Sequence, residues 1–338
     1  MKKTGKSTIK DVAREAGVSI SVVSYVINAT PGISITKETQ KRVRAAVKKL
    51  GYHPHAAARR LRNKKSATIA VVSFWKITDP MYTEVLAGIS EAAAQQRYHV
   101  LLSDLDTDRK QYEYLDLYRQ GIVDGVILVL PADLIDLNEA AHLRRIRREK
   151  IPALFINNLS PCSGVGTIAF DYEGTAGTAV RFLHAQGHRT IDFIGANRRE
   201  CEDPVGKKRI DGFRSAAKEL EVEGDVLTLR QFERHLCEKD PKDRSSAIVV
   251  SKIIHYRNIL GMCAKYKVRI PQDLSVVCAN HNALHQAFEP KPVCVGIPLR
   301  SIGENAVHRL LKGENESAEL PENRMIEGDS VIPKKYDK

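Results

Sequence analysis

Residues 8–28 read TIKDVAREAGVSISVVSYVIN and predict two short helices joined by a tight turn. The apolar residues of the first helix recur at helical spacing, at Ile9, Val12, Ala13 and Ala16. Thr8 and Asp11 have the spacing of a capping box, which would start this helix. Gly17 readily adopts the left-handed conformation that ends a helix, and Ser19 is a suitable N-cap for the next one.

The second of these helices has two unlike faces. Its apolar face is formed by Val22, Val23, Val26 and Ile27. The other face carries Ile20, Ser21 and Tyr25, and no acidic residue. A third helix is expected over residues 36–50, closed by Gly51, and its inward-facing residues would be Val43, Val47 and Leu50. Three short helices around one small core are typical of a helix-turn-helix domain.

In such a domain the second helix lies in the major groove of DNA. The hydroxyl groups of Ser21 and Tyr25 would contact base edges or phosphates there, and Ile20 would contact thymine methyl groups. An acidic side chain on this face would repel the phosphate backbone. The sequence therefore predicts base readout by Ile20, Ser21 and Tyr25.

The excess positive charge of the chain lies in its first 66 residues. The whole chain has a net charge of +12. Residues 1–66 contain 16 lysines and arginines against 3 acidic residues, whereas the remainder contains 37 and 38. Such a concentrated imbalance favours a module that binds a polyanion over a basic face that is merely solvated.

Other features narrow the class of protein. The cysteines lie far apart without a CxxC pair, which predicts small buried side chains rather than a metal site or a disulfide framework. No long apolar run and no secretory signal are present, so a cytoplasmic protein without a membrane partner is expected. The sequence also lacks GxSxG, Walker-loop and HExxH motifs. We therefore assign no catalytic residue, metal or cofactor, and we do not expect an enzyme.

The stretch at residues 8–28, followed by KETQKRVRAAVKKLGYHPHAAARRLR, closely resembles the headpiece of the lactose-repressor (LacI/GalR) family of bacterial transcription regulators. The resemblance implies a cytoplasmic, nucleoid-associated protein that binds double-stranded DNA at a pseudo-palindromic operator as a homodimer. It further implies phosphate contacts from Thr8, Ser19, Ser24 and Asn28. Tyr25 departs from the family, which often has Arg or His there, and the loop at residues 29–35 is about two residues longer.

The same resemblance implies a hinge over residues 55–62 that becomes helical only on DNA, in a dimer. Ala58 and Leu61 match the hinge positions that enter the minor groove, with Leu61 as the wedge. An apolar wedge unstacks one base step at a cost of roughly a few kcal/mol and bends the duplex. The neighbouring Arg59, Arg60 and Arg62 would offset this cost through phosphate contacts.

After residue 66 the sequence alternates between strand-like and helix-like segments, which predicts parallel sheets with helices on both faces. The expected strands are residues 68–74, 99–104, 125–130, 152–157, 167–170, 190–195, 246–251, 274–279 and 293–298, with a last one near 325–332. The expected helices are residues 81–96, 109–119, 138–149, 173–186, 206–220, 253–266 and 301–311. Two such sets resemble the periplasmic-binding-protein-like effector domain of the same family, with two doubly wound subdomains.

The expected domain boundaries follow from this resemblance. The headpiece would comprise residues 1–54 and the hinge and linker residues 55–66. The first effector subdomain would comprise 67–165 and 296–326, the second 166–295, and the C-terminal strand and tail 327–338.

An effector would bind where the strand ends of the two subdomains face each other. By resemblance to carbohydrate-responsive relatives, its contacts would come from Arg209, from Ser251 and Lys252, and from Asn280. In the last two places those relatives have carboxylates. Three alternatives stay open. The first is an anionic ligand, such as a phosphorylated sugar or an organic acid, held by Arg209 and Lys252 with His281 as a further candidate. The second is a neutral sugar held by groups such as Trp75, Asp171 and Asn280, and the third is a degenerate cleft, with control by a protein partner or by abundance.

The predicted function is therefore that of a repressor of carbohydrate or related catabolic genes, modulated by a small molecule between the subdomains. The alternatives are a regulator with no ligand or under the control of a protein partner, and a solute-binding protein. A solute-binding protein would not need the basic headpiece.

Overall fold

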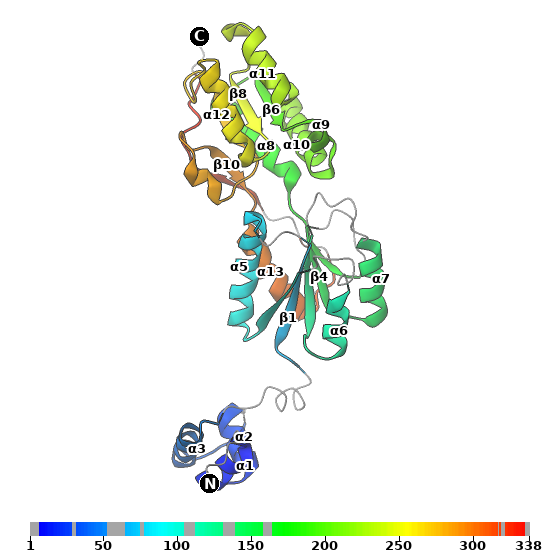
Figure 1. Ribbon diagram of the computed structural model, residues 1–338, viewed down its shortest axis with the longest axis vertical. Helices are drawn as coiled ribbons and strands as arrows, with labels where there is room; N and C mark the ends of the chain where they lie inside the picture. The colour runs from blue at the N-terminus through cyan, green and yellow to red at the C-terminus, as the bar shows by residue number, and fades with distance from the viewer. Residues whose placement is uncertain are drawn as a thin grey trace. The chain divides into compact units, whose positions relative to one another are not determined.

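The computed structural model describes residues 7–28, 32–52, 65–74, 78–104, 112–130, 139–157, 164–316, 318 and 322–334 (Figure 1). The chain divides into two compact units, residues 1–66 and residues 67–338. No helix in the described part of the chain is long and apolar enough to cross a membrane.

The first unit contains three helices, as the apolar pattern predicts: α1 (Ile9–Ala16), α2 (Ile20–Asn28) and α3 (Lys37–Leu50). Its buried residues are Val12, Ala13, Ala16, Val23, Val26, Val43, Ala46 and Tyr52. Val22, Ile27, Val47 and Leu50 pack against this cluster while staying partly exposed. The predicted stripe is thus confirmed, and Tyr52 adds an aromatic ring to it.

The ends of these helices follow the predicted chemistry. The Thr8 side chain accepts a hydrogen bond from the Asp11 backbone N–H, and the Asp11 carboxylate accepts one from the Thr8 backbone N–H, which completes a capping box. Gly17 ends α1 and Gly51 ends α3 in the left-handed conformation, with φ of 61° and 55°. The Ser19 hydroxyl accepts a hydrogen bond from the Val22 N–H at 3.3 Å, as expected of an N-cap.

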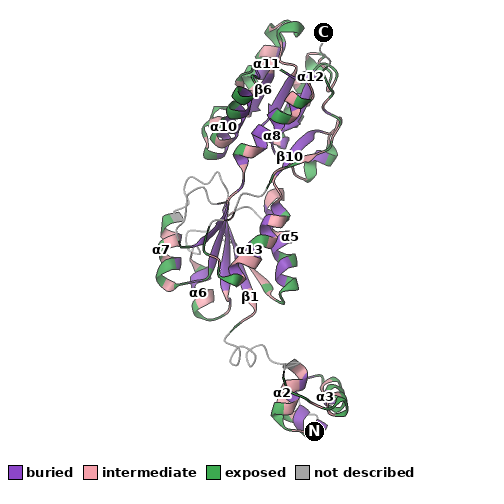
Figure 2. Cartoon of the chain, turned by 180° about the vertical axis from the view of Figure 1, so that it is seen from behind, coloured by how far each residue is buried: buried purple, intermediate pink, exposed green. Residues whose placement is uncertain are grey.

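The first sheet of the second unit is entirely parallel, with strand order β2-β1-β3-β4-β5. Its strands are β1 (Thr68–Ser73), β2 (His99–Asp104), β3 (Gly125–Val129), β4 (Ala153–Ile156) and β5 (Gly166–Ile168). Its helices are α5 (Pro80–Gln95), α6 (Glu113–Arg119), α7 (Glu139–Glu149) and α13 (Leu299–Lys312). Ile69 and Val71 of β1 pack in the cluster with α5 and α13, and the alternate residues Ala70 and Val72 pack in the cluster with α6 and α7. Both faces are therefore covered, which explains the continuous apolar runs of the strands (Figure 2).

The second sheet has the order β11-β10-β9-β8-β6-β7 and is parallel except for the antiparallel pair β10–β11. Its strands are β6 (Ile191–Gly195), β7 (Val226–Thr228), β8 (Ala247–Val250), β9 (Ser275–Cys278), β10 (Val293–Gly296) and β11 (Arg324–Ile326). Its helices are α8 (Tyr172–Ala185), α9 (Arg198–Glu202), α10 (Pro204–Glu219), α11 (Leu229–Glu238) and α12 (Tyr256–Lys265), with 3-10 turns η1 (Pro241–Asp243), η2 (Ile253–His255) and η3 (Ala283–Ala287). The run β7-β6-β8-β9-β10 repeats the order of the first sheet, so the second unit is two doubly wound subdomains.

Two strands correct the predicted subdomain boundaries. The sequence predicts that the segment 167–170 opens the second subdomain, but β5 pairs with β4 and completes the first sheet. It also assigns residues 296–326 to the first subdomain. Ile297, α13 and Ala318 do pack there, but β11 pairs with β10 of the second sheet. The chain therefore crosses between subdomains after β5, after β10 and again before β11.

Among the described residues, the sequence prediction lacks two helices, one strand and two 3-10 turns: α9, α11, β7, η1 and η3. The strand β7 has only three residues, which is too few to show a period. The start of α11 is a capping box formed by Thr228 and Gln231, and Phe232 and Leu236 form its buried stripe. The sequence therefore contains a signal for α11.

The cysteines confirm the prediction only in part. Cys263, Cys278 and Cys294 are buried, but Cys237 is exposed at the end of α11. Cys162 lies outside the described residues.

The segment 328–334 forms hydrogen bonds to neighbouring strands of the second sheet, close to the residues where these strands begin. The buried Ser330 hydroxyl donates to the Val276 carbonyl and accepts from the Val293 N–H, so it bridges β9 and β10. Further along, Ile332 exchanges hydrogen bonds with the Ser275 hydroxyl, and its carbonyl lies 3.2 Å from His188 Nε2. Residues distant in sequence from the strands thus complete their hydrogen bonding.

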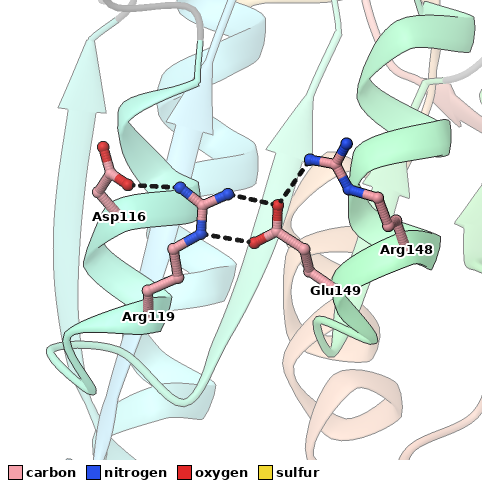
Figure 3. Close-up of polar contacts among 4 residues, drawn as sticks. All are labelled: Asp116, Arg119, Arg148 and Glu149. Atoms are coloured by element: carbon pink, nitrogen blue, oxygen red, sulfur yellow. Dashed lines mark hydrogen bonds and ion pairs between the residues drawn. The ribbon is translucent and has the colours of Figure 1, made fainter.

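Helices α6 and α7 are joined at their C-terminal ends by an ion-pair network (Figure 3). Arg119 donates to both oxygens of Glu149 and also to Asp116, and Arg148 lies 3.3 Å from Glu149. Arg119 is 51% exposed. Its contribution to the free energy of unfolding is therefore small, because water screens the ion pair.

Candidate DNA-binding surface and effector pocket

The N-terminal half of α2 forms an uncharged exposed surface. Ile20 is 43% exposed, Ser21 is exposed and Tyr25 is half-buried, while Val23 and Val26 on the opposite face are buried. The first turn of α2 contains no acidic residue. An exposed isoleucine beside hydroxyl groups at a helix N-terminus has the chemistry for thymine methyl groups, base edges and phosphates.

The residues predicted to contact phosphates differ in their exposure and in the hydrogen bonds that they already form within the protein. The Thr8 hydroxyl donates to Asp11 Oδ2 at 2.7 Å within the capping box, so a phosphate would have to compete for it. Ser19 is exposed at the start of α2, and Ser24 is half-buried on the same helix. Asn28 is the last residue of α2. The hinge residues Ala58 and Leu61 lie outside the described residues.

A pocket of about 310 Å³ lies between the two subdomains of the second unit. It is lined by Asp79, Pro80, Met81, Tyr172, Asp203, Val205, Arg209, Lys252, Ile253, Ile254, Asn280, Asn282 and Leu284. Lys252 follows β8 and Asn280 follows β9, so these residues stand at the carboxyl ends of parallel strands, where ligands bind in open α/β sheets. Arg209, Lys252 and Asn280 are thus brought together as predicted.

Arg209 is the most deeply buried charge in this pocket. It is 2% exposed, its guanidinium carbon lies 5.1 Å from the centre of the Tyr172 ring, and its Nε has no hydrogen-bond partner among the described residues. Burial lowers the pKa of Arg209, while Tyr172 and the carboxylates of Glu200 and Asp203 counteract that effect. A buried donor left unpaired costs about 1–3 kcal/mol, which a ligand oxygen would recover.

Glu200 on α9 organises the wall behind Lys252. Its carboxylate accepts hydrogen bonds from the Ser251 hydroxyl and from His255 Nε2, the latter at 2.8 Å, and Lys252 Nζ lies 3.8 Å away. Burial opposes ionisation of Glu200. The hydrogen bonds from His255 and Ser251, with attraction from His255 and Lys252, outweigh burial and lower the pKa of Glu200 to about 2. The charge of Lys252 is therefore balanced within the protein.

The close approach of α9 to α10 depends on Gly206. A Cβ atom at Gly206 would stand 1.8 Å from the Glu200 carbonyl oxygen. The N-cap of α10 is Asp203, whose Oδ1 accepts from the Gly206 N–H at 2.6 Å. The start of α10 thus fixes both Glu200 and Arg209 relative to the pocket.

Two of the predicted effector residues, Ser251 and Asp171, do not line this pocket. Ser251 is buried and faces Glu200 instead. Asp171 caps α8 and accepts from the Asn323 side chain at 2.9 Å, so its carboxylate has a structural role. Trp75 lies outside the described residues.

Sequence reasoning missed Glu200, Asp79 and Asp203. The two aspartates are N-caps of α5 and α10, each directly before a proline. The Asp-Pro pair is a recognisable helix-start signal, but it does not reveal that both caps face one pocket. Glu200 carries no signal of its own, because its partners follow it by some 50 residues.

A helix-turn-helix unit joined to two α/β subdomains with a pocket at their strand ends defines a DNA-binding transcription regulator with a periplasmic-binding-protein-like domain. Residues 8–55 match the bacterial regulatory proteins of the lacI family. Residues 66–248 match the periplasmic binding proteins and sugar binding domain of the LacI family, and residues 180–335 match the periplasmic binding protein-like domain. The chain belongs to the lacI family of bacterial regulatory proteins.

Named relatives align along nearly the whole chain. Catabolite control protein A of Priestia megaterium is 28% identical, over 91% of this chain and 93% of its own. The HTH-type transcriptional repressor PurR of Photobacterium profundum is 29% identical, over 90% of this chain and 91% of its own. The HTH-type transcriptional regulator DegA of Bacillus subtilis (strain 168) is 28% identical, over 95% of each.

Solved structures share the fold. The lac repressor dimer bound to operator and the anti-inducer ONPF superimposes with a TM-score of 0.74 at 20% identity, covering 97% of this chain and 100% of that one. The complex of the transcriptional regulator CelR with cellobiose superimposes with a TM-score of 0.60 at 22% identity, covering 96% and 99%.

Proposed function

We propose that this protein is a homodimeric repressor that reads a pseudo-palindromic operator through Ile20, Ser21 and Tyr25 of α2. The observation that carries the proposal is the N-terminal half of α2, which exposes an apolar and hydroxyl surface free of acidic residues on a strongly basic unit. Thr8, Ser19, Ser24 and Asn28 contact phosphates, and Ala58 and Leu61 enter the minor groove. The protein acts in the cytoplasm, on the nucleoid.

The dimer follows from the geometry of DNA. One short recognition helix contacts few base pairs, whereas two helices related by a two-fold axis read two half-sites about one helical turn apart. The lac repressor structure that shares this fold is a dimer bound to operator, which supports the assignment.

Fluorescence anisotropy with the purified full-length protein tests this function. A labelled palindromic duplex selected from a randomised pool should bind far more tightly than a scrambled duplex. The affinity should fall steeply with salt, because each neutralised phosphate releases a counterion. Equal affinity for selected and scrambled duplexes at physiological salt, with and without sugars, would refute the function.

The pocket supports a neutral polyhydroxylated effector rather than an anion. Its donors are Arg209, Lys252 and Asn280, and its acceptors are the side-chain oxygens of Asp79, Asp203 and Asn282. Lys252 is already paired with Glu200, so among the described lining residues Arg209 is the cation that forms no ion pair and could bind an anion. The regulated genes are accordingly those of carbohydrate or related catabolism, as the cellobiose complex of CelR and the names of the relatives also suggest.

Isothermal titration calorimetry with cellobiose, other neutral sugars and glucose 6-phosphate tests the ligand class. A neutral sugar should release heat and change operator affinity, and Arg209→Gln should weaken its binding by about tenfold or more. Arg214→Gln, an exposed change on the same helix α10, should leave sugar binding unaltered. Binding of sugar phosphates alone would overturn the neutral class and leave operator recognition intact.

A further inference from the structure

A second cavity, of about 430 Å³, lies wholly within the second subdomain. It shares no lining residue with the effector pocket. Of its lining residues, Ser245 lies shortly before β8, and Asp273 and Leu274 directly precede β9. In the effector pocket, Lys252 and Asn280 follow the same two strands. The two cavities are therefore at opposite ends of the strands.

The floor of this cavity is apolar and fully formed. Phe232 and Leu236 from α11, Ile248 from β8 and Leu274 are all buried, with exposures between 0% and 4%. They belong to the cluster through which α11 and α12 pack on the sheet (Figure 1). A concave apolar floor of this size is typical of small-molecule sites of about 300–1,000 Å³.

The rim carries an excess of unpaired positive charge. Arg244 donates from Nε to the Lys239 carbonyl and from a terminal nitrogen to the Leu236 carbonyl, at 3.0 and 2.8 Å. Its guanidinium is thus held in place by neutral groups. Within the described part of the chain, no carboxylate forms an ion pair with Arg244 or with the lysines at positions 239 and 267, which also line the cavity.

The two carboxylates of the cavity are already engaged. Asp192 is 5% exposed and accepts from the Asp225 N–H at 2.8 Å. Asp273 accepts from the guanidinium and the backbone N–H of Arg269, and these hydrogen bonds lower the pKa of Asp273 to about 2. Neither carboxylate is paired with the rim cations.

We propose that this cavity is a second ligand site that binds a small amphiphilic anion. The apolar body lies on Phe232, Leu236 and Ile248. The anionic head, a carboxylate or a phosphate monoester, faces Arg244 with Lys239 and Lys267 beside it. Both head groups are compact oxyanions attached to an alkyl or aryl chain.

Calorimetry on the full-length protein, with octanoate, hexyl phosphate and 1-octanol as probes, tests the site. Octanoate or hexyl phosphate should bind about tenfold or more tightly than the neutral alcohol, because charge-assisted hydrogen bonds are the stronger kind. The better of the two acids identifies the head group. Equal affinity for acid and alcohol, or no binding of either acid, would overturn the proposal.

Variants locate the binding. Ser245→Trp should abolish octanoate binding by filling the cavity, and Arg244→Gln should weaken it by about tenfold. Because Arg244 also caps α11, Lys267→Gln serves as the second charge variant and should weaken octanoate without lowering the melting temperature. Lys252→Gln in the effector pocket should leave octanoate binding unchanged. Loss of octanoate binding in Lys252→Gln, or its persistence in Ser245→Trp, would place the ligand elsewhere.

Discussion

Tyr25 lies half-buried on the side of α2 that we propose contacts the operator, at the position where related headpieces often carry a charged side chain. Its phenol offers one hydroxyl and an aromatic edge, so its readout differs from the bidentate guanine contact of an arginine. We expect Tyr25→Ala to relax the preference at one or two base pairs of each half-site, by about 1–3 kcal/mol. Selection on randomised half-sites measures this.

The control for Tyr25 is Tyr52, which is buried in the core of the same unit. Tyr52→Ala should lower the melting temperature without changing the selected motif at any affinity that remains measurable. An unchanged motif in Tyr25→Ala would remove Tyr25 from base readout.

Single residues of the effector pocket were only partly predictable from sequence. The convergence of Arg209, Lys252 and Asn280 could be predicted from the resemblance to carbohydrate-responsive relatives, together with the rule that ligands bind at the carboxyl ends of parallel strands. The pairing of Lys252 with Glu200 could not, because it depends on the packing of α9 against the turn η2. That pairing favours the neutral ligand among the three alternatives that the sequence leaves open.

The low pKa of Glu200 makes a prediction about acid stability. A carboxyl whose pKa falls from 4.5 to about 2 on folding stabilises the protein above about pH 4.5, and this stabilisation is lost as the pH falls toward 2. The free energy of unfolding of the wild type should therefore exceed that of Glu200→Gln by on the order of 2–3 kcal/mol near pH 6.

Urea denaturation at pH 6, 4 and 3 measures this difference, which should shrink toward the acid end. Glu233→Gln is the matched control, since its carboxyl is paired with Lys265 at an exposed site. A difference for Glu200→Gln that does not change with pH would contradict the assignment.

At the scale of elements, helices and strands with a clear period were predicted, and short ones were misplaced. The strand β5 has only three residues, and it pairs with β4 at the edge of the first sheet. It does so because the chain forms this strand before it crosses to the second subdomain. The antiparallel β11 is assigned by its pairing with β10, a long-range contact that no local pattern encodes. Secondary-structure propensity and hydrophobic period are properties of a single segment. The sheet to which a strand belongs depends instead on its long-range pairing with other strands.

The contact between α9 and α10 predicts opposite effects for two helical glycines. Gly206→Ala forces a methyl group onto the Glu200 carbonyl and should destabilise the protein by about 1–3 kcal/mol. Gly261→Ala on α12 meets no atom within 4 Å and should stabilise it by up to about 1 kcal/mol. Thermal unfolding of both variants checks the pair, and equal effects would contradict the packing at Gly206.

The predicted hinge wedge is tested by Leu61→Gly. Loss of the apolar wedge should weaken specific operator binding much more than binding to random DNA, because only the specific complex bends the duplex. Anisotropy with both duplexes measures the ratio, and Arg144→Gln, an exposed change on α7, is the control. A uniform loss on both DNAs would remove Leu61 from the minor groove.

At the scale of the whole molecule, we expect the edge of the first sheet to contribute to the contact between two copies. Leu102 on the edge strand β2 is 47% exposed. We expect Leu102→Asp to weaken the dimer by about tenfold or more, because a charge would be desolvated at the contact. Analytical ultracentrifugation measures it, and Ile33→Asp in the first unit, at a residue of 40% exposure, should leave the dimer intact.

The strand pairing and hydrogen bonds that residues 324–334 contribute to the second sheet have a consequence for protein synthesis. The helix-turn-helix unit can fold as soon as its three helices leave the ribosome. The second sheet, in contrast, has an unpaired edge at β10 until β11 and Ser330 have been synthesised. A nascent chain stalled after α13 would therefore contain a folded DNA-binding unit and an incompletely folded second subdomain. Frameshifts late in the coding sequence should yield regulators that aggregate or are degraded, rather than regulators that are merely unresponsive.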